Sequence, residues 1–294
     1  MSDATHEATA GAAVRAPVVS IVVPAHNEAA VIAGNMRRLL AGTEPGEFDV
    51  IVVPNGCVDD TAEKAREVPG LRVIESEVGG KVNALRVGDA ACRTFPRIYL
   101  DADVELSADS VRALVAACAR PGVLACAPAP RLDTDGVGFL ARRVHAVHEQ
   151  LIGPRRALAG AGVYVLTEPG HARVFPMPDV ISDDGWVHGS FTADERTVVR
   201  EAVSVVRPAR TVRAHLNRRI RVRQGNRQLA ELGRSAPEGR LGPKALLNLV
   251  TEKKVSPLDA GCYLGVLAVD RVLVRVRRGH GVRWGSDSSS RASR

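Results

Sequence analysis

The chain has 294 residues, a formal net charge of +7, and 45% apolar but only 3% aromatic residues. This length allows one large α/β domain, or one domain with a smaller appendage, whose core comes from Val, Leu, Ala and Ile. No apolar run reaches the ~18–20 residues that a membrane-spanning helix needs. The first residues also lack the order of a secretory signal, so we expect a cytoplasmic protein with a disordered leader over 1–16.

Cysteine usage indicates the same compartment. The number of cysteines is odd, and no pair has C-x-x-C spacing. This pattern favours reduced, buried thiols over a disulfide framework or a zinc site. The five residues are Cys57, Cys92, Cys118, Cys126 and Cys262.

The charge is unevenly distributed along the chain. Residues 201–294 contain 20 Lys/Arg and 7 Asp/Glu, a net charge of +13, whereas the rest of the chain is acidic. A basic C-terminal part can face phosphates, acidic lipid headgroups or nucleic acid. Charge alone leaves these three partners open.

The first half alternates short apolar runs with helical patterns. Alternation at this spacing predicts βαβ units and a mainly parallel sheet flanked by helices. In such sheets, ligands bind at the carboxyl ends of the strands. The predicted strands are 18–23, 48–53, 71–74 and 98–100. The first predicted helix has Ile32, Met36 and Leu39 on one face, and further helices are predicted at 61–68, at 81–91 and from about 108.

The second half has a looser pattern. It predicts strands at 124–127, 163–166 and 203–206, and helices at 137–151, near 186–191 and over 211–232. We assign 17–235 to the α/β domain and 236–294 to a linker, an amphipathic basic helix and a loose tail. In that helix one face is expected to carry Cys262, Val266, Val269, Leu273 and Val276, with Arg271, Arg275 and Arg278 opposite.

Two carboxylates, Asp101 and Asp103, directly follow the predicted strand 98–100. Sheet geometry presents them in the ligand crevice, where an unpaired charge is costly. Hard oxygen ligands suit Mg²⁺ or Mn²⁺, which often bind through one or two carboxylates plus substrate phosphates. The alternative is a solvated turn or a cap of the next helix.

Six motifs occur in a fixed order: SIVVPAHNEA, VVPNGCVDDT, GGKVNALRVG, YLDADVEL, GAGVYVL and VISDDGWV. Over roughly residues 18–232 the chain thereby resembles the family-two, inverting glycosyltransferases of the GT-A fold. The resemblance implies a hexosyltransferase-type enzyme that takes a sugar from a nucleoside-diphosphate donor, with UDP favoured. It further implies Mn²⁺ or Mg²⁺ as cofactor and a hydroxyl acceptor, such as a lipid-linked or polysaccharide one.

The same resemblance implies roles for residues of the donor site. Asp103 would hold the metal directly, while Asp101 would bind the ribose or a metal-bound water. Glu28 would contact the nucleoside, although an acid in a first helical turn also favours the helix dipole. Lys81, at a predicted helix start, would meet a phosphate or the nucleoside. Its alternative is a surface lysine.

Asp184 is the predicted general base. An inverting transfer is one in-line displacement, so a group must accept the proton of the attacking hydroxyl. Asp183 beside it is a like charge and can raise the pKa of its neighbour. The pair could instead be an exposed loop pair or a helix cap.

Two motifs depart from the family pattern. The family often has an Arg-Trp that closes over the diphosphate, whereas this chain has RRIRVRQGN, from which Arg219 or Arg223 could serve. Where many relatives have Asp-Asp-Gly-Ser, Asn55 stands in PNGC; its amide can still read a pyrimidine edge. Asp59 either touches the nucleotide or caps the next helix.

Rival functions fit less well. A dinucleotide oxidoreductase would need G-x-G-x-x-G, and a P-loop phosphohydrolase G-x-x-x-x-G-K-[ST]; neither occurs. A nucleotidyltransferase on a similar fold would carry an early Gly- and Arg-rich loop. Few aromatics accompany the arginines, so nucleic acid is not expected. The basic helix could rest on the inner face of a membrane or pack on the catalytic domain.

Overall fold

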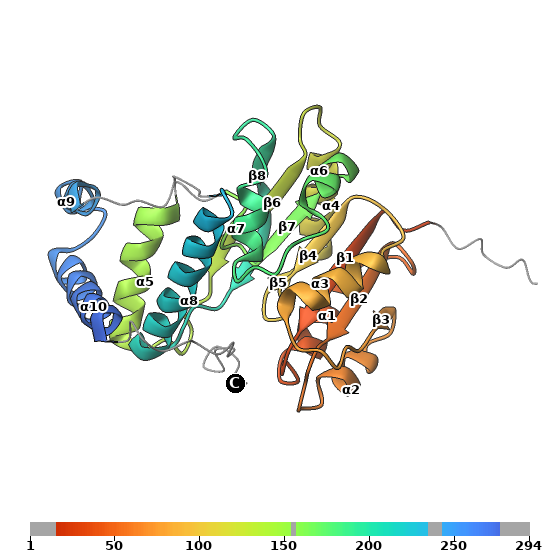
Figure 1. The fold of residues 1–294 in the computed structure, drawn as a ribbon, viewed down its shortest axis with the longest axis horizontal. Helices are drawn as coiled ribbons and strands as arrows, with labels where there is room; N and C mark the ends of the chain where they lie inside the picture. The colour runs from red at the N-terminus through yellow and green to blue at the C-terminus, as the bar shows by residue number, and fades with distance from the viewer. Residues whose placement is uncertain (1–15, 154–156, 235–242, 277–294) are drawn as a thin grey trace, which may run out of the picture.

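The structure is a computed structural model that describes residues 16–153, 157–234 and 243–276 (Figure 1). Apart from Ala16, the predicted leader lies outside the described residues, as do residues 236–242 and 277–294 of the predicted linker, helix and tail.

Four parallel strands form one half of an eight-stranded sheet, as the alternating pattern predicts. They are β1 (Val19–Ala25), β2 (Phe48–Pro54), β3 (Leu71–Val73) and β4 (Arg97–Leu100), in the spatial order β3-β2-β1-β4. Every residue of β1 and β2 is buried. Helices cover both faces of such a sheet, which is why β1 and β2 are apolar apart from the buried pair Ser20 and Asp49.

The other half of the sheet is mixed. Here β7 (Val163–Leu166) pairs antiparallel with β4, β6 (Ala125–Leu132) antiparallel with β7, and β8 (Arg196–Val206) parallel with β6. The edge strand β5 (Glu105–Leu106) pairs antiparallel with β8. The sequence did not predict β5 because two residues carry no periodic signal, and β8 is longer than predicted because its first half is polar.

Helices form a layer on each face of the sheet. Val19, Ile21 and Val23 of β1 pack in the core under α1 (Ile32–Leu40), α2 (Thr61–Arg66) and α4 (Ala108–Cys118). Val22 points the other way, into the core under α3 (Lys81–Ala90), α6 (Glu168–Val174) and α7 (Asp183–His188). Each fully buried aliphatic side chain contributes roughly 1.5–3 kcal/mol, so the two cores fix the sheet firmly.

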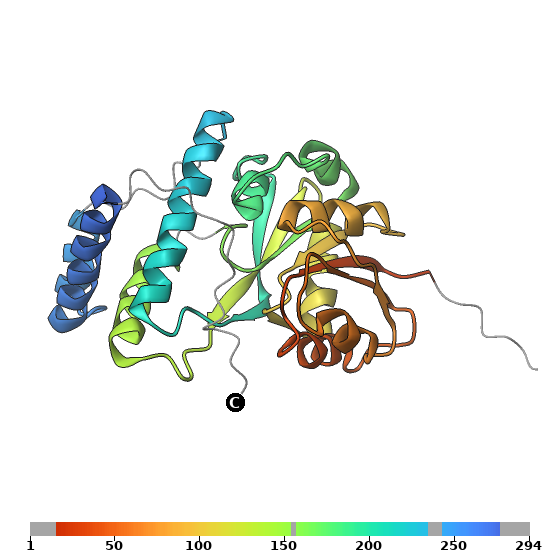
Figure 2. The same ribbon diagram turned by 60° about the horizontal axis from the view of Figure 1, so that its bottom comes forward.

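A further group of helices lies beside the mixed half of the sheet (Figures 1 and 2). It comprises α5 (Phe139–Ile152), α8 (Val212–Glu231), α9 (Pro243–Thr251) and α10 (Pro257–Val276). They share a separate small core that includes Val147, Leu216 and Tyr263. No helix among the described residues is long and apolar enough to cross a membrane.

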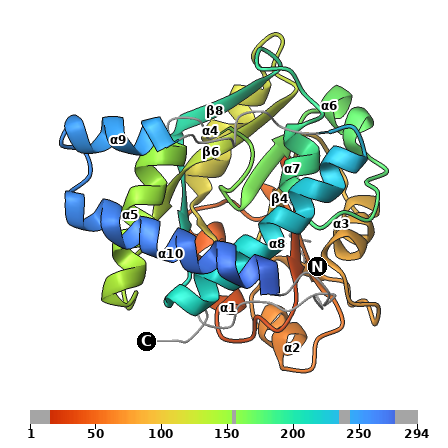
Figure 3. The same ribbon diagram turned by 60° about the vertical axis from the view of Figure 1, so that its left-hand side comes forward.

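The predicted face of the tail helix is correct only in part. Val266 of that face is buried and Arg271, expected opposite, is exposed, but Val269 is 50% exposed and Tyr263 and Asp270 are buried. The side chains of Leu273, Arg275 and Val276, and Arg278 as a whole, lie outside the described residues. The helix packs against α5 and α8 (Figure 3), where Asp270 pairs with two arginines of α8. The expectation that this helix packs on the preceding part of the chain is confirmed, because α10 contacts α5 and α8.

Candidate active site

The Asp101–Asp103 turn lies at the carboxyl end of β4, next to the start of β7. The N–H of Asp101 donates to the carbonyl of Gly162 at 2.9 Å, and that of Val104 to the carbonyl of Asp101 at 3.0 Å. Gly162 has φ +66°, and a Cβ there would lie 2.5 Å from Val104 Cγ2. Only glycine meets both demands without strain. This explains why the second glycine of the GAGVYVL segment, Gly162, is needed.

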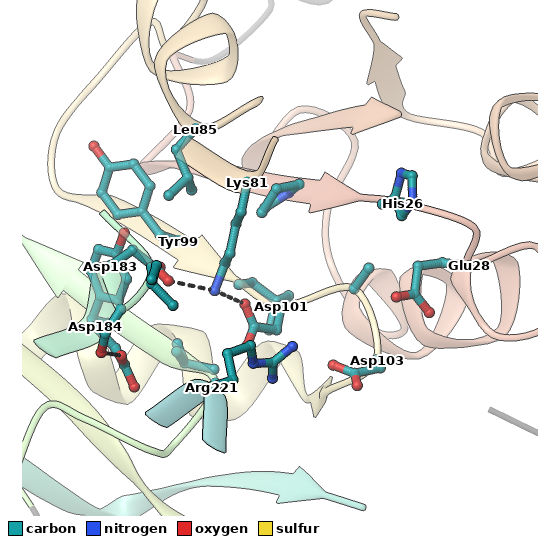
Figure 4. A pocket seen from close by; sticks show the side chains of 18 of the residues that line it. His26, Glu28, Lys81, Leu85, Tyr99, Asp101, Asp103, Asp183, Asp184 and Arg221 are labelled. Carbon is teal, nitrogen blue, oxygen red and sulfur yellow. Dashed lines mark hydrogen bonds and ion pairs between the residues drawn. The ribbon is translucent and has the colours of Figure 1, made fainter. Parts of the chain in front are cut away.

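Seven of the predicted site residues line one pocket, shown in Figure 4. They come from segments far apart in the chain: the ends of β1, β2 and β4 and the starts of α3 and α7. The structure thus brings together Glu28, Asn55, Lys81, Asp101, Asp103, Asp183 and Asp184.

Lys81 joins the two acidic groups of this pocket. Its ammonium lies 2.6 Å from Asp101 Oδ1 and 2.9 Å from Asp183 Oδ1. Burial by itself lowers the pKa of Lys81, but the charges of Asp101 and Asp183 outweigh burial and raise it. Lys81 is therefore a permanent cation that holds β4 and α7 together electrostatically, rather than a surface lysine.

Asp183 and Asp184 form the first turn of α7, which corrects the prediction of a loop before the helix. Ser182 caps this helix, because its hydroxyl accepts from the N–H of Gly185 at 3.3 Å. A six-residue helix carries too little periodicity to be placed from sequence alone. The N-cap alternative for the acidic pair is also resolved, since Ser182 occupies that position.

The two neighbouring carboxylates differ in pKa. Burial raises the pKa of Asp183, although Lys81 opposes this effect. Burial also acts on Asp184, but Lys81 and hydrogen bonds from Ser182 Oγ (2.8 Å) and the N–H groups of Gly160 (2.9 Å) and Gly185 (2.8 Å) lower its pKa overall. Asp184 is therefore ionised at neutral pH and fixed in orientation.

The side chain of Asn55 hydrogen-bonds to backbone groups around the pocket. The amide donates to the carbonyl of Ala25 at 2.8 Å and accepts from the N–H of Gly80 at 3.0 Å. His26 Nδ1 lies 2.7 Å from the carbonyl of Asn55. These bonds tie β1 and β2 to the start of α3, which favours a structural role for this amide over direct reading of a base.

Glu28 and Asp59 occupy different positions around this end of the sheet. Glu28 is buried at the pocket, and its N–H donates to Thr61 Oγ1 at 2.8 Å. Asp59 does not line the pocket; it accepts from the N–H groups of Ala29 and Thr61, each at 3.2 Å. The geometry therefore favours the helix-start role over the nucleotide contact for Asp59.

The predicted arginines point away from the pocket. Arg219 and Arg223 of α8 pair with Asp270 of α10 instead. The opposite face of α8 places Arg218 and Arg221 in the pocket wall, and Arg221 points toward the aspartates in Figure 4. The sequence contained a signal for this choice: Arg218, Arg221 and Gly225 share one helical face.

The part of the pocket that contains Asp101 and Asp103 fits a hard divalent cation. The carboxylates of Asp101 and Asp103 both line it. Among the described residues no group of three or more His, Cys, Asp or Glu side chains could hold a metal ion. The described residues therefore do not form a metal site made of protein ligands alone. Mg²⁺ and Mn²⁺ commonly bind one or two carboxylates and complete their coordination shell with phosphate and water oxygens.

Comparisons with known proteins identify the family of the chain. The family model described as glycosyl transferase family 2 matches residues 20–175. Validoxylamine A glucosyltransferase from Streptomyces hygroscopicus subsp. limoneus is 30% identical over 126 residues, which cover 40% of this chain and 28% of that protein. The chain thus matches less than a third of the length of this curated relative.

Two solved structures share the fold over most of the chain. Mannosyltransferase PcManGT from Pyrobaculum calidifontis, in complex with GDP-Man and Mn²⁺, has a TM-score of 0.59 at 18% identity and covers 90% of this chain and 80% of its own. Glucosyl-3-phosphoglycerate synthase from Mycobacterium tuberculosis, with Mn²⁺, UDP and glucosyl-3-phosphoglycerate, has a TM-score of 0.53 at 20% identity and covers 74% and 81%. Because the family model matches more than half of the residues, the chain belongs to glycosyl transferase family 2, and it has the GT-A fold.

Proposed function

We propose that this glycosyltransferase moves a sugar from a nucleoside-diphosphate donor, with UDP favoured, to an acceptor hydroxyl with inversion at the anomeric carbon. The observation that carries the proposal is one pocket in which Asp101 and Asp103 lie on one side of Lys81 and Asp183 and Asp184 on the other (Figure 4). Lys81 joins the two sides. Similar folds bound to GDP-Man or UDP with Mn²⁺ support it.

The donor diphosphate would lie on the Asp101–Asp103 side. These two carboxylates would hold Mn²⁺ or Mg²⁺, which when bound supplies Lewis-acid stabilisation of charge on the leaving diphosphate. Arg218 and Arg221 would bind the diphosphate oxygens, because guanidinium forks match phosphate geometry. The nucleoside would lie beside Glu28, near the ends of β1 and β2.

Asp184 would accept the acceptor proton. The acceptor oxygen attacks the anomeric carbon, the bond to the diphosphate oxygen breaks with its electron pair on the diphosphate, and the hydroxyl proton goes to the Asp184 carboxylate. Its lowered pKa keeps that carboxylate ionised before attack, and three hydrogen bonds fix it. Asp183 fits this role less well, because its side chain is 6% exposed and is paired with Lys81.

The outer face of α10 supports contact with a membrane surface. Leu258, Leu264, Val269 and Val272 are between 50% and 61% exposed on this one helix. Residues 271–294 add seven arginines and one aspartate. An exposed apolar helix face combined with a polybasic segment is the combination that binds acidic bilayers. We therefore propose that α10 rests on an acidic membrane surface, where a lipid-linked acceptor would be within reach.

Replacing Asp103 with Ala is expected to abolish the metal-dependent part of donor binding. Wild-type protein should melt at a higher temperature with Mn²⁺ and the correct nucleotide sugar than with either alone, because ligands that bind the folded state stabilise it. The variant should lose this added shift and about 100-fold or more in turnover. Asp109→Ala, at a 92% exposed side chain of α4, is the matched control. Mn²⁺-dependent turnover in the Asp103 variant would contradict the metal assignment.

Asp184→Asn is expected to keep donor binding but lose about 10²–10⁴-fold in turnover, since the amide cannot accept the proton. NMR of the wild-type product should show inverted anomeric configuration. Asp179→Asn, at an 86% exposed side chain before α7, controls for a charge change nearby. An active, folded Asp184 variant would remove this residue as the base, and a retained configuration would refute the single displacement.

Lys81→Met is expected to destabilise the protein more at about pH 8 than at about pH 5. Without the ammonium, burial raises the pKa of Asp183 further. A raised folded-state pKa contributes stability below the unfolded value and loses it as pH rises through the folded value. The loss should stay below the ~3–5 kcal/mol of a fully buried pair, because Lys81 is 30% exposed.

Thermal melts at the two pH values test the Lys81 variant. Lys64→Met, which removes a surface pair with Glu67, is the control and should change little at either pH. Equal destabilisation by Lys81→Met at both pH values would show that Asp183 does not depend on this ammonium.

Flotation of the full chain with vesicles tests the membrane contact. Binding is expected to vesicles rich in phosphatidylglycerol, to fall with salt, and to be lost in the double variant Leu264→Asp, Val272→Asp. Val58→Asp, at a 91% exposed residue far from α10 in the fold, should bind like wild type. Lack of wild-type flotation would eliminate the membrane proposal. Concentration-dependent dimerisation lost in the double variant would instead assign this face to a second copy.

A further inference from the structure

The arginine-rich helix α8 contacts the pocket with one face and α10 with another. Arg218, Arg221 and Val222 lie on the side that lines the pocket. Leu216, Arg219 and Arg223 lie on the side that packs against α10. A rotation or shift of α8 would therefore move the pocket arginines and the α10 contacts together.

Asp270 of α10 holds the second face. It is 3% exposed, and both of its oxygens are bonded to α8. Its Oδ2 accepts from Arg219 Nε at 3.1 Å, and its Oδ1 accepts from Arg223 Nη2 at 2.8 Å, while Arg223 Nη1 also donates to Oδ2. Burial raises the pKa of Asp270, but the hydrogen bonds from Arg223 and Arg219 outweigh it and lower the pKa. The carboxylate is thus ionised and held by two guanidiniums one turn apart.

The far part of α8 contacts the segment that carries Asp184. Gln228 Nε2 donates to the carbonyl of Asp179 at 2.9 Å, and its Oε1 accepts from the N–H of Ile181 at 2.8 Å. A Cβ at Gly225 would come within 3.0 Å of Ser182 Cβ, so this glycine allows the close approach. One rigid helix therefore spans from Asp270 to the cap of α7.

We propose that Asp270 is a positioning residue for donor binding: it fixes α8 so that Arg221 and Arg218 face the diphosphate. The helices α9 and α10 are then part of the catalytic unit, although they lie beyond both residues 20–175, which match the family model, and the 17–235 domain. This inference rests on the proposed function, because it takes the pocket ligand to be a nucleoside diphosphate.

The physical basis is the cost of leaving the two guanidiniums without their carboxylate. Arg219 and Arg223 are 26% and 38% exposed, so their charges are partly desolvated and repel each other once Asp270 is neutral. The repulsion is relieved by movement of α8 relative to α10. Such movement displaces Arg221 from the diphosphate, and a displacement of this kind weakens binding without removing any contact residue.

The test compares Asp270→Asn with Asp259→Asn in the full chain. Asp259 also ties α10 down, but its partner is Arg143 of α5 rather than a residue of α8. Both variants are expected to melt at lower temperature. Only Asp270→Asn should weaken UDP binding with Mn²⁺ and raise the donor KM, by about 3- to 30-fold, the range carried through an intermediate residue. The affinity of Asp270→Asn for UMP, which lacks the second phosphate, should fall less than its affinity for UDP. Asp270→Glu should restore part of the effect.

The outcomes separate this inference from the proposed function. If wild-type protein binds UDP more tightly than UMP and Asp270→Asn keeps that preference in full, the positioning role is overturned while the proposed function stands. If both variants raise the donor KM equally, the effect is general loss of α10 packing, which also overturns the role. If wild-type protein binds no nucleoside diphosphate, the proposed function itself fails.

Discussion

The Lys81 ammonium between Asp101 and Asp183 is the interaction on which the site depends. Four aspartates and Glu28 line one pocket, and like charges that close would raise one another's pKa or force the walls apart. Lys81 compensates two of them and leaves Asp103 and Asp184 on its two sides. Because α3 starts at this lysine, the position of the helix on the sheet sets the separation of the two acidic groups.

The two halves of the sheet contribute different parts of this arrangement. The parallel half delivers Glu28, Asn55 and Asp101 to one edge, because parallel strands end on the same side. The antiparallel β7 then brings Gly162 against the Asp101 turn, and its missing side chain lets the two backbones meet. Asp183 and Asp184 reach the pocket from α7, outside the parallel strands.

Sequence reasoning succeeded where one residue pattern has one structural meaning. The apolar runs that became β1 and β2 could only be buried strands, and the polar residues after them had to share an edge. It was wrong where the outcome depends on a distant partner. Helical spacing in RRIRVRQGN groups Arg218 and Arg221 on one face, but it does not tell whether that face or the face of Arg223 lines the pocket. The second face pairs with Asp270, 47 residues from Arg223. The same aspartate is buried on α10, whereas Val269, which apolar spacing placed on the buried face, is 50% exposed.

The basic C-terminal charge divides into parts with different physical roles. Arg207 binds Glu105 and also lies 3.4 Å from Asp133, so its charge ties β8 to its neighbours. Arg219 and Arg223 are compensated by Asp270. Arg218 and Arg221 are instead directed to a pocket that also carries carboxylates. A pocket with both arginines and carboxylates suits a ligand that is an anion bound to a cation. The arginines can bind the oxygens of a diphosphate, while the carboxylates bind its metal ion.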